Sequence, residues 1–244
     1  MTSVWSTNAI HPAGALSGTL VRTPYAIDAR PVERLTIPDR SYRLAKRALD
    51  ISLVIGLAPV WVPMYGAASL AIAVLEGRPI HYRDRRVGTG GRDLKLLKLR
   101  TMSVNASDDL MALLEGDPAL KAEFVRFAKL HSDPRLTPLG RILRRLSLDE
   151  LPQLLHVLRG EMSLVGPRPL TRWEIEQFYG DEAHELLSVP PGLTGLWQIS
   201  GRSLLSFERR VPLDLAYVRN RSIALDLKIL LRTIPKVARG HGAI

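Results

Sequence analysis

The apolar stretch ALDISLVIGLAPVWVPMYGAASLAIAVL, residues 48–75, contains a single charged residue, Asp50. An apolar run of roughly 18 residues or more is typical of a segment embedded in a membrane. The alternative is the core helix of a soluble domain, but so long a run without a polar face is rare in a domain of this size. Pro59 and Pro63 lie inside the run, where each removes a backbone hydrogen bond and favours a kink.

Both flanks of this stretch are basic, which constrains how it sits in a membrane. Basic residues beside a membrane segment tend to stay in the cytoplasm. A straight span places its flanks on opposite sides, whereas a helix that enters, bends at Pro59 and returns keeps both flanks in the cytoplasm. The sequence therefore predicts a re-entrant membrane helix over residues 41–77, with a simple span as the alternative. The basic flanking residues are Arg40, Arg43, Lys46 and Arg47 before the stretch, and Arg78, Arg83, Arg85 and Arg86 after it.

The composition points to an anionic partner. The chain has 244 residues, with 34 Lys and Arg against 24 Asp and Glu, and a sequence pI of about 10.3. Such an excess favours nucleic acid, a lipid head group or a phosphate substrate. The absence of cysteine excludes disulfides, thiolate catalysis and cysteine-ligated zinc. The six histidines have none of the short spacings that a metal site needs.

Three segments are expected along the chain. Residues 1–40 mix Thr, Ser, Pro, Ala and Gly without periodicity and predict a mostly disordered tail. The membrane segment follows, and residues 78–244 then form a compact cytosolic domain with amphipathic helices at the membrane interface. Two short runs around GTGGRD, residues 88–93, predict a β-hairpin, and the later pattern is mainly helical, ending with helices near 206–219 and 224–238. The expected fold is mainly α with a small β-hairpin, an α+β arrangement.

The stretch LSLDELPQLLHVLRGEMSLVGPRPL, residues 146–170, carries the candidate chemistry. Ser147 and Glu150 match the S-x-x-E capping box, and Asp149 is an alternative helix cap. Arg144 precedes the two carboxylates, and Arg168 follows them between two prolines that restrict the backbone. Carboxylates among arginines suit either a salt-bridge network or a phosphate site, where a carboxylate binds a divalent metal or attacks phosphorus.

The sequence resembles the bacterial sugar transferases, the monotopic polyprenyl-phosphate hexose-1-phosphate transferases that start exopolysaccharide and other surface glycan assembly. The resemblance extends over nearly everything after the tail. Its motifs occur in order, which makes it far more specific than any one of them. They are LAKRALD (44–50), RRVG (85–88), KLRTM (98–102), DPRLTPLGRILRR (133–145), DELPQ (149–153), GPRP (166–169), PGLTGLWQISGR (191–202) and LDLAYVRNRSIALDLKIL (213–230).

The resemblance implies a reaction and its site residues. A UDP-sugar would give its hexose 1-phosphate to undecaprenyl phosphate and release UMP, through a covalent phosphosugar on an aspartate, with Mg²⁺ as cofactor. Asp149 matches the nucleophile and Glu150 its partner, and both would hold the metal. Arg144, Arg168, Arg202 and Lys98 match residues that contact phosphate, and Asp214 matches a further active-site acid. Pro59 matches the membrane kink. Lys46 and Arg47 match the basic pair where the chain enters the membrane.

The resemblance also implies surroundings. The protein would lie in the bacterial inner (cytoplasmic) membrane with its catalytic domain on the cytoplasmic face. Its partners would be the UDP-sugar, undecaprenyl phosphate and membrane lipid, with no nucleic acid, and a homodimer stays open. The chain resembles the minimal form of the family, without the additional membrane-spanning region of larger members.

Some positions depart from the family pattern. Ala58 stands before Pro59 where serine is usual, so a hydroxyl that could satisfy a carbonyl freed at the bend is absent. His156 and Glu161 stand where Asn and Asp are common. None of these is a residue assigned to chemistry.

Two other functions fit parts of the sequence. A membrane-anchored basic protein that binds anionic lipid or nucleic acid would explain the charge and the apolar stretch, but not the carboxylates beside Arg168. A soluble nucleotide-sugar enzyme of another kind would need a phosphate-binding motif, and no dinucleotide glycine fingerprint follows a strand.

Overall fold

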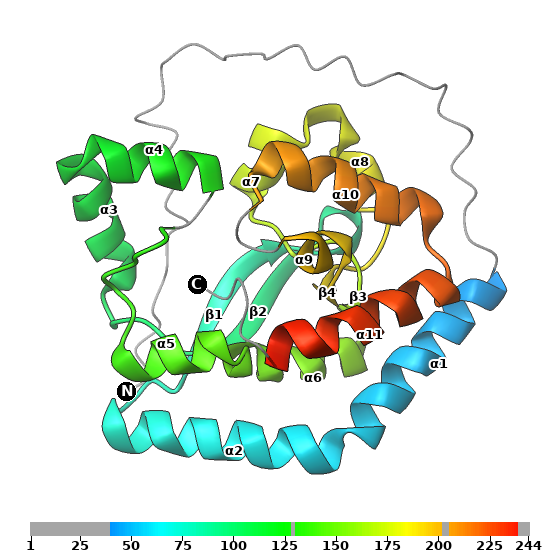
Figure 1. The fold of residues 1–244 in the computed structure, drawn as a ribbon, viewed down its shortest axis with the longest axis horizontal. Coiled ribbons are helices and arrows are strands. Elements are labelled where there is room, and N and C mark those ends of the chain that lie inside the picture. The colour runs from blue at the N-terminus through cyan, green and yellow to red at the C-terminus, as the bar shows by residue number, and fades with distance from the viewer. Residues whose placement is uncertain (1–39, 128–129, 202–204, 239–244) are drawn as a thin grey trace.

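The computed structural model describes residues 40–127, 130–201 and 205–238 (Figure 1). Within them the chain is mainly helical with two small two-stranded sheets, which confirms the expected fold class in outline. The predicted tail lies outside the described residues except for Arg40, which begins the first helix. The helices are α1 (Arg40–Gly56), α2 (Ala58–Leu75), α3 (Ala106–Gly116), α4 (Pro118–Phe127), α5 (Pro138–Arg145), α6 (Leu154–Arg159), α7 (Arg172–Phe178), α8 (Ala183–Leu186), α9 (Leu196–Ser200), α10 (Phe207–Asn220) and α11 (Ile223–Ala238).

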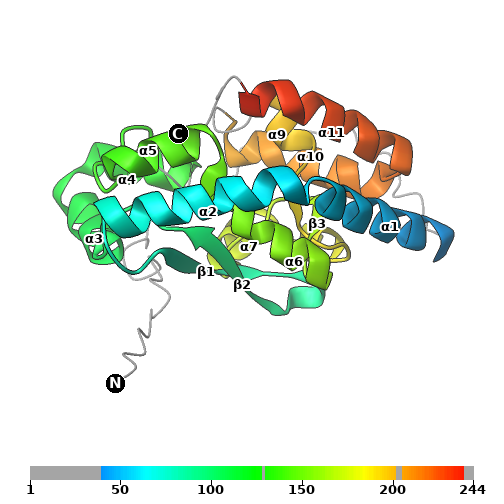
Figure 2. The same cartoon turned by 90° about the horizontal axis from the view of Figure 1, so that it is seen from below.

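The apolar stretch forms two helices with a break between them. The break falls at Leu57, whose φ of −91° and ψ of 0° end the regular helix. The break lies two residues before Pro59, the proline at which a kink was predicted. Pro59 lies in the first turn of α2, where a missing N–H costs nothing. Figures 1 and 2 show α2 running along one edge of the molecule and α1 continuing from it at an angle.

A tryptophan side chain donates a hydrogen bond at the bend between α1 and α2. The indole N–H of Trp61 donates to the Val54 carbonyl across the break, at 2.9 Å. A carbonyl left free at the bend would lose hydrogen-bonding energy in an apolar environment. Trp61 therefore satisfies the Val54 carbonyl at the bend.

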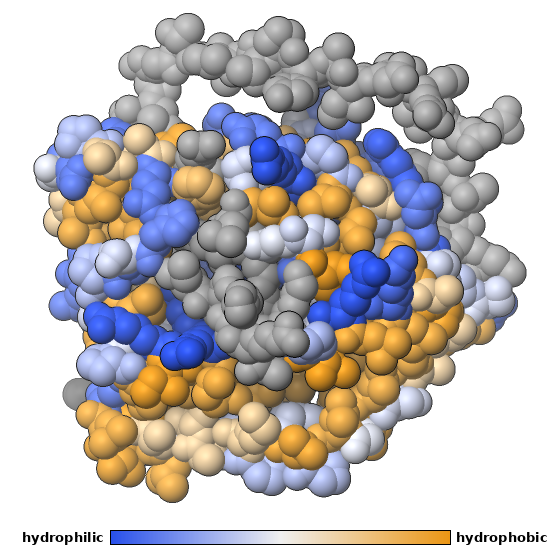
Figure 3. Space-filling view, viewed as in Figure 1, coloured by the Kyte–Doolittle hydropathy of each residue, from blue (hydrophilic) through white to orange (hydrophobic). Residues whose placement is uncertain are grey.

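α2 is long and apolar enough to cross a membrane, by length and composition, among the residues described here. Only 17% of its 18 residues are buried, so the core-helix alternative is wrong. Its inner side packs Ala68 and Ile72 against Leu99 and Leu143. Figure 3 shows the apolar surface along α2. The exposed apolar side chains around the break and on α2 are Ile55, Leu57, Val60, Val62, Met64, Leu70, Val74 and Leu75.

α1 is fixed to the rest of the protein through its polar side chains. Lys46 Nζ lies 2.8 Å from Asp226 Oδ2 on α11, and the Arg47 guanidinium donates to the carbonyls of Val157 and Leu158 at the end of α6. Asp50 is buried and accepts from the Ser163 hydroxyl at 2.7 Å. The basic pair assigned to the start of the membrane segment thus binds the helices of the domain.

The predicted hairpin is confirmed. Strands β1 (His81–Val87) and β2 (Asp93–Leu99) pair antiparallel around the short 3-10 turn η2 (Thr89–Gly91). Gly90 and Gly91 have φ of +66° and +80°, which glycine adopts without strain. In this register Lys98 lies on the same face as Leu96 and Asp84, because alternate residues share a face.

A second sheet, absent from the sequence-based expectations, joins two loops. Strands β3 (Ser163–Val165) and β4 (Gly192–Thr194) pair parallel. Glycines make the close approach possible: a Cβ on Gly192 would lie 2.0 Å from the Gly166 nitrogen, and a Cβ on Gly195 would lie 2.3 Å from the Gly166 oxygen. The GPRP loop is therefore pressed against the segment that begins PGLTG.

Candidate active site

Asp149 and Glu150 lie on a 3-10 turn, η3 (Leu148–Gln153), and not at the start of an α-helix. The capping-box prediction is wrong, since Ser147 takes a left-handed φ of 56° and its side chain makes no cap hydrogen bond. The alternative with Asp149 as a helix cap is not seen either, because α6 begins at Leu154, beyond Gln153, without a side-chain cap. Pro152 has no N–H to donate, which favours the tighter turn. The two carboxylates are thus free of a capping role.

Asp149 is buried among charges of both signs. Only 8% of the residue is exposed. Burial, and then the neighbouring Glu150, raise its pKa to about 6, while Lys98 and Arg144 act in the opposite direction. A carboxylate with few hydrogen bonds beside cations is a suitable nucleophile or metal ligand.

Arg144 reaches the site from α5. Its Nε donates to the Thr101 hydroxyl at 3.0 Å. Burial lowers its pKa, and Asp149 partly restores it. The planar guanidinium is therefore oriented by Thr101 beside the carboxylate, where it can also contact phosphate oxygens.

The hairpin supplies Lys98 from the opposite side. Its Nζ lies 3.9 Å from Asp84 Oδ2, and its pKa is lowered by burial and raised in part by Asp84 and Glu150. Asp84 is held by Arg86 at 2.6 Å, and Arg86 also contacts Glu174 at 3.0 Å. This row of paired charges fixes Lys98 near Asp149.

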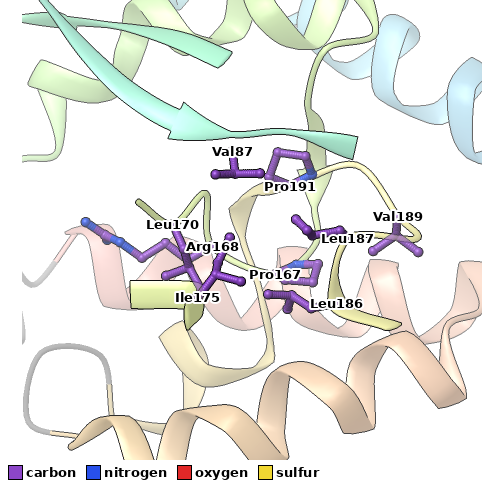
Figure 4. Close-up of a pocket in the computed structure, with 9 residues that line it drawn as sticks. All are labelled: Val87, Pro167, Arg168, Leu170, Ile175, Leu186, Leu187, Val189 and Pro191. Carbon is purple, nitrogen blue, oxygen red and sulfur yellow. The ribbon is translucent and has the colours of Figure 1, made fainter. Parts of the chain in front are cut away.

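Arg168 extends the cationic surface beyond Lys98. Figure 4 shows its guanidinium directed away from the apolar side chains that gather around the GPRP loop. Its Cζ lies 5.6 Å from the centroid of Trp197, and Arg210 lies over the same ring at 4.4 Å. Both arginines therefore make cation–π contacts with the Trp197 ring.

Asp214 lies beneath this arrangement rather than at its surface. It is 1% exposed and accepts a hydrogen bond from the Tyr179 hydroxyl at 2.7 Å. Burial raises its pKa to about 7, with smaller opposite effects from Tyr179 and Arg210. Asp214 is thus hydrogen-bonded to Tyr179 and lies within electrostatic range of Arg210 and Arg168.

The structure brings together Asp149, Glu150, Arg144, Lys98 and Arg168, as the sequence predicted. Arg202 lies outside the described residues. Lys46 and Arg47 anchor α1, and Pro59 lies in the first turn of α2.

Several residues at the site escaped the sequence-based prediction. Asp84 and Arg86 lie in the charge-rich strand β1. Trp197 lies in the short helix α9, and Arg210 lies four residues before Asp214 on α10. The four-residue spacing would have placed Arg210 beside Asp214. The stacking on Trp197 depends on tertiary structure alone.

The two departures from the family pattern contact each other. His156 Nδ1 and Glu161 Oε2 are 2.5 Å apart, and the Leu97 N–H donates to His156 Nε2 at 3.1 Å. The pair therefore links α6 to β2 next to Lys98. His156 and Glu161 therefore satisfy one another at these two positions.

The carboxylate pair is suited to Mg²⁺. No group of three or more acidic or histidine side chains that could hold a metal occurs in the part of the chain that the structure describes. Mg²⁺ needs fewer, since it keeps several waters and binds through one or two carboxylates together with substrate phosphates. Glu150 raises the pKa of Asp149, and a cation held by both would offset that repulsion.

Comparison with known proteins identifies the relatives of this chain. Residues 41–240 match the model of the family described as bacterial sugar transferase. The chain is 43% identical over 204 residues to the exopolysaccharide production protein ExoY of Sinorhizobium fredii, covering 82% of this chain and 88% of that protein. It is 34% identical over 250 residues to the UDP-glucose:undecaprenyl-phosphate glucose-1-phosphate transferase of Caulobacter vibrioides, covering 96% of this chain and 87% of that protein.

A third relative is longer. The chain is 40% identical over 208 residues to the undecaprenyl-phosphate galactose phosphotransferase of Salmonella typhimurium, covering 84% of this chain but 42% of that protein. The family match covers all the described site residues. This chain belongs to the bacterial sugar transferase family.

Proposed function

We propose that the protein transfers hexose 1-phosphate from a UDP-sugar to undecaprenyl phosphate, as the first step of exopolysaccharide or other surface glycan synthesis. The observation that carries this proposal is the buried Asp149, which lies beside the half-buried Glu150 and within electrostatic range of Lys98 and Arg144. Relatives named as undecaprenyl-phosphate sugar-phosphate transferases support it. The products are UMP and a lipid diphosphate-linked sugar.

In the proposed mechanism Asp149 is the nucleophile. Its carboxylate oxygen attacks the phosphorus that bears the sugar, and the bond from that phosphorus to the bridging oxygen breaks. UMP leaves with the bridging oxygen, and the sugar phosphate stays on Asp149 as an acyl phosphate. A phosphate oxygen of undecaprenyl phosphate then attacks the same phosphorus and releases the Asp149 carboxylate. No net proton transfer is needed.

The cations around Asp149 would lower the barrier. A nucleotide diphosphate and a carboxylate repel each other, and Lys98, Arg144 and Arg168 offset that repulsion in a site of low polarity. Asp149 and Glu150 would hold Mg²⁺, which supplies charge neutralisation at the phosphate oxygens. Phosphoryl transfer depends largely on such positioning and charge.

We place α1 and α2 in the membrane as a re-entrant helix, with the domain on the cytoplasmic face. The break at Leu57 and the exposed apolar side chains of α2 support this arrangement. Further apolar side chains are exposed on α5, directly after it and on α11, and they suit helices that lie in the membrane interface. They are Ile142, Leu146, Leu227, Leu231 and Ile234.

UMP release tests the proposed function. Membranes or purified protein are incubated with a panel of UDP-sugars, Mg²⁺ and undecaprenyl phosphate. We expect UMP release with at least one donor, and a loss of at least about 10³-fold in Asp149→Asn, which keeps the shape but not the nucleophilic oxygen. Asp93→Asn is the control, because Asp93 has 88% of its side chain exposed and pairs with Arg172, which is also exposed. Normal turnover by Asp149→Asn would refute the nucleophile assignment.

A further inference from the structure

A pocket opens beside the carboxylate pair. Lys98, Glu150 and Arg168 line it together with two glutamines, Gln153 from η3 and Gln198 from α9. The charged residues are those assigned to phosphate and metal. The glutamines have no role in that chemistry.

Both glutamines carry buried polar atoms without a partner. Gln153 is 2% exposed, and its Nε2 has no hydrogen-bond acceptor in the described structure. Gln198 Oε1 is also buried, and it has no hydrogen-bond donor among the described residues. A buried amide group that lacks a hydrogen bond destabilises the fold, so its presence at a pocket indicates a missing ligand group. The chain's third glutamine, Gln177 on α7, is exposed.

We infer that Gln153 and Gln198 bind hydroxyl groups of the hexose and contribute to the choice of sugar. This inference rests on the proposed function. A carboxamide offers both a donor and an acceptor, as a sugar hydroxyl requires. One amide nitrogen and one amide oxygen are unpaired at the two positions, which suits neighbouring hydroxyls.

The position of the pocket favours the sugar over the uracil. Gln153 lies four residues after Asp149 on the same short turn, and the pocket borders Glu150. In the covalent intermediate the sugar is attached directly to the phosphate on Asp149. The uracil is separated from that phosphate by a ribose and a second phosphate, and it departs with UMP. The sugar alone stays next to these glutamines throughout the reaction.

The first test uses the unmodified protein. UDP-sugars that support UMP release are compared with analogues in which one ring hydroxyl is replaced by hydrogen. We expect kcat/KM to fall about 10-fold to 100-fold for at least one deoxy analogue, because the glutamine is then left unpaired. Equal kcat/KM for all the deoxy analogues would overturn the inference.

The second test determines which sugar hydroxyl each glutamine contacts. Gln153→Met and Gln198→Met remove the amide at similar volume, and Gln177→Met is the matched control. We expect kcat/KM of each site variant to fall about 10-fold or more with the parent UDP-sugar. With the deoxy analogue that lacks the partner hydroxyl, the same variant should lose little kcat/KM relative to the unmodified protein. Gln177→Met should match the unmodified protein on every donor.

Other outcomes are distinguishable. Equal losses on parent and deoxy donors would show that the glutamines do not contact hydroxyls. Weaker inhibition by UMP in the glutamine variants, with unchanged deoxy penalties, would instead assign them to the nucleotide and overturn the inference. An unmodified protein that releases no UMP with any donor would refute the proposed function itself. Should Gln153→Met fail to fold, Gln198→Met and the deoxy series still decide.

Discussion

At the scale of single residues, the candidate site contains two buried carboxylates in different surroundings. Asp149 is buried beside Glu150 and cations, and its pKa is raised to about 6. Asp214 is buried deeper, hydrogen-bonded to Tyr179, and its pKa is raised to about 7. The first lies beside a pocket-lining acid, and the second beneath Arg210. We therefore propose a chemical role for Asp149 and a structural role for Asp214.

The raised pKa of Asp214 predicts how stability depends on pH. Its ordinary value is 3.8, and burial raises it to about 7. Between these values the folded protein keeps a proton that the unfolded chain has lost, so the free energy of unfolding falls as pH rises from about 4 to about 7. A shift of this size corresponds to roughly 4 kcal/mol.

Asp214→Asn tests this link, because asparagine keeps an oxygen for the Tyr179 hydroxyl and cannot ionise. We expect the variant to lose less free energy of unfolding than the unmodified protein between pH 4 and pH 7, by up to roughly 4 kcal/mol. Chemical unfolding of the detergent-solubilised proteins at several pH values measures the difference. Identical pH dependence in both proteins would contradict the buried, protonated Asp214.

At the scale of elements, the site depends on two segments whose backbones approach closely because the contact residues are glycines. β3 and β4 pair parallel, and Gly166, Gly192 and Gly195 allow backbone contact at this point. Arg168 lies two residues after Gly166, and Trp197 lies two residues after Gly195. The close approach of the loops therefore sets the position of Arg168 against Trp197.

Gly192→Ala should disturb both stability and activity. Its Cβ would lie 2.0 Å from the Gly166 nitrogen, so the loops must separate. Overpacking of this kind costs about 1–3 kcal/mol, and we expect a loss of about 3 kcal/mol in the free energy of unfolding, together with reduced UMP release. Gly116→Ala is the matched control, since a Cβ there meets nothing within 4 Å. Equal stability of the two variants would contradict the contact.

Much of the site could be predicted from the sequence, and the limits have physical causes. The order of motifs located Asp149, Glu150, Arg144, Lys98 and Arg168, because each lies in a short local pattern. The capping box failed, since Ser147 adopts a left-handed conformation that local sequence did not reveal. The β3–β4 pairing also escaped prediction, because it joins segments with no strand-like periodicity.

At the scale of the whole molecule, the central expectation is that both flanks of α1–α2 lie on one side of the membrane. The chain has no cysteine, so single cysteines can be introduced without background labelling. Arg43 and Arg78 are exposed, which makes Arg43→Cys and Arg78→Cys suitable probes.

We expect both cysteines to react only from the cytoplasmic side with a reagent that cannot cross the membrane. Labelling is compared in intact cells and in inverted membrane vesicles. Labelling of the two positions from opposite sides would replace the re-entrant helix by a simple span.

The most direct test of the covalent mechanism omits the lipid acceptor. The purified protein is mixed with Mg²⁺ and an accepted UDP-sugar that carries a label in the sugar, and UMP is measured over time. The account predicts a burst of UMP equal to the amount of enzyme, with the label retained on the peptide that contains Asp149. Release of UMP only after undecaprenyl phosphate is added, with no label on the protein, would contradict it.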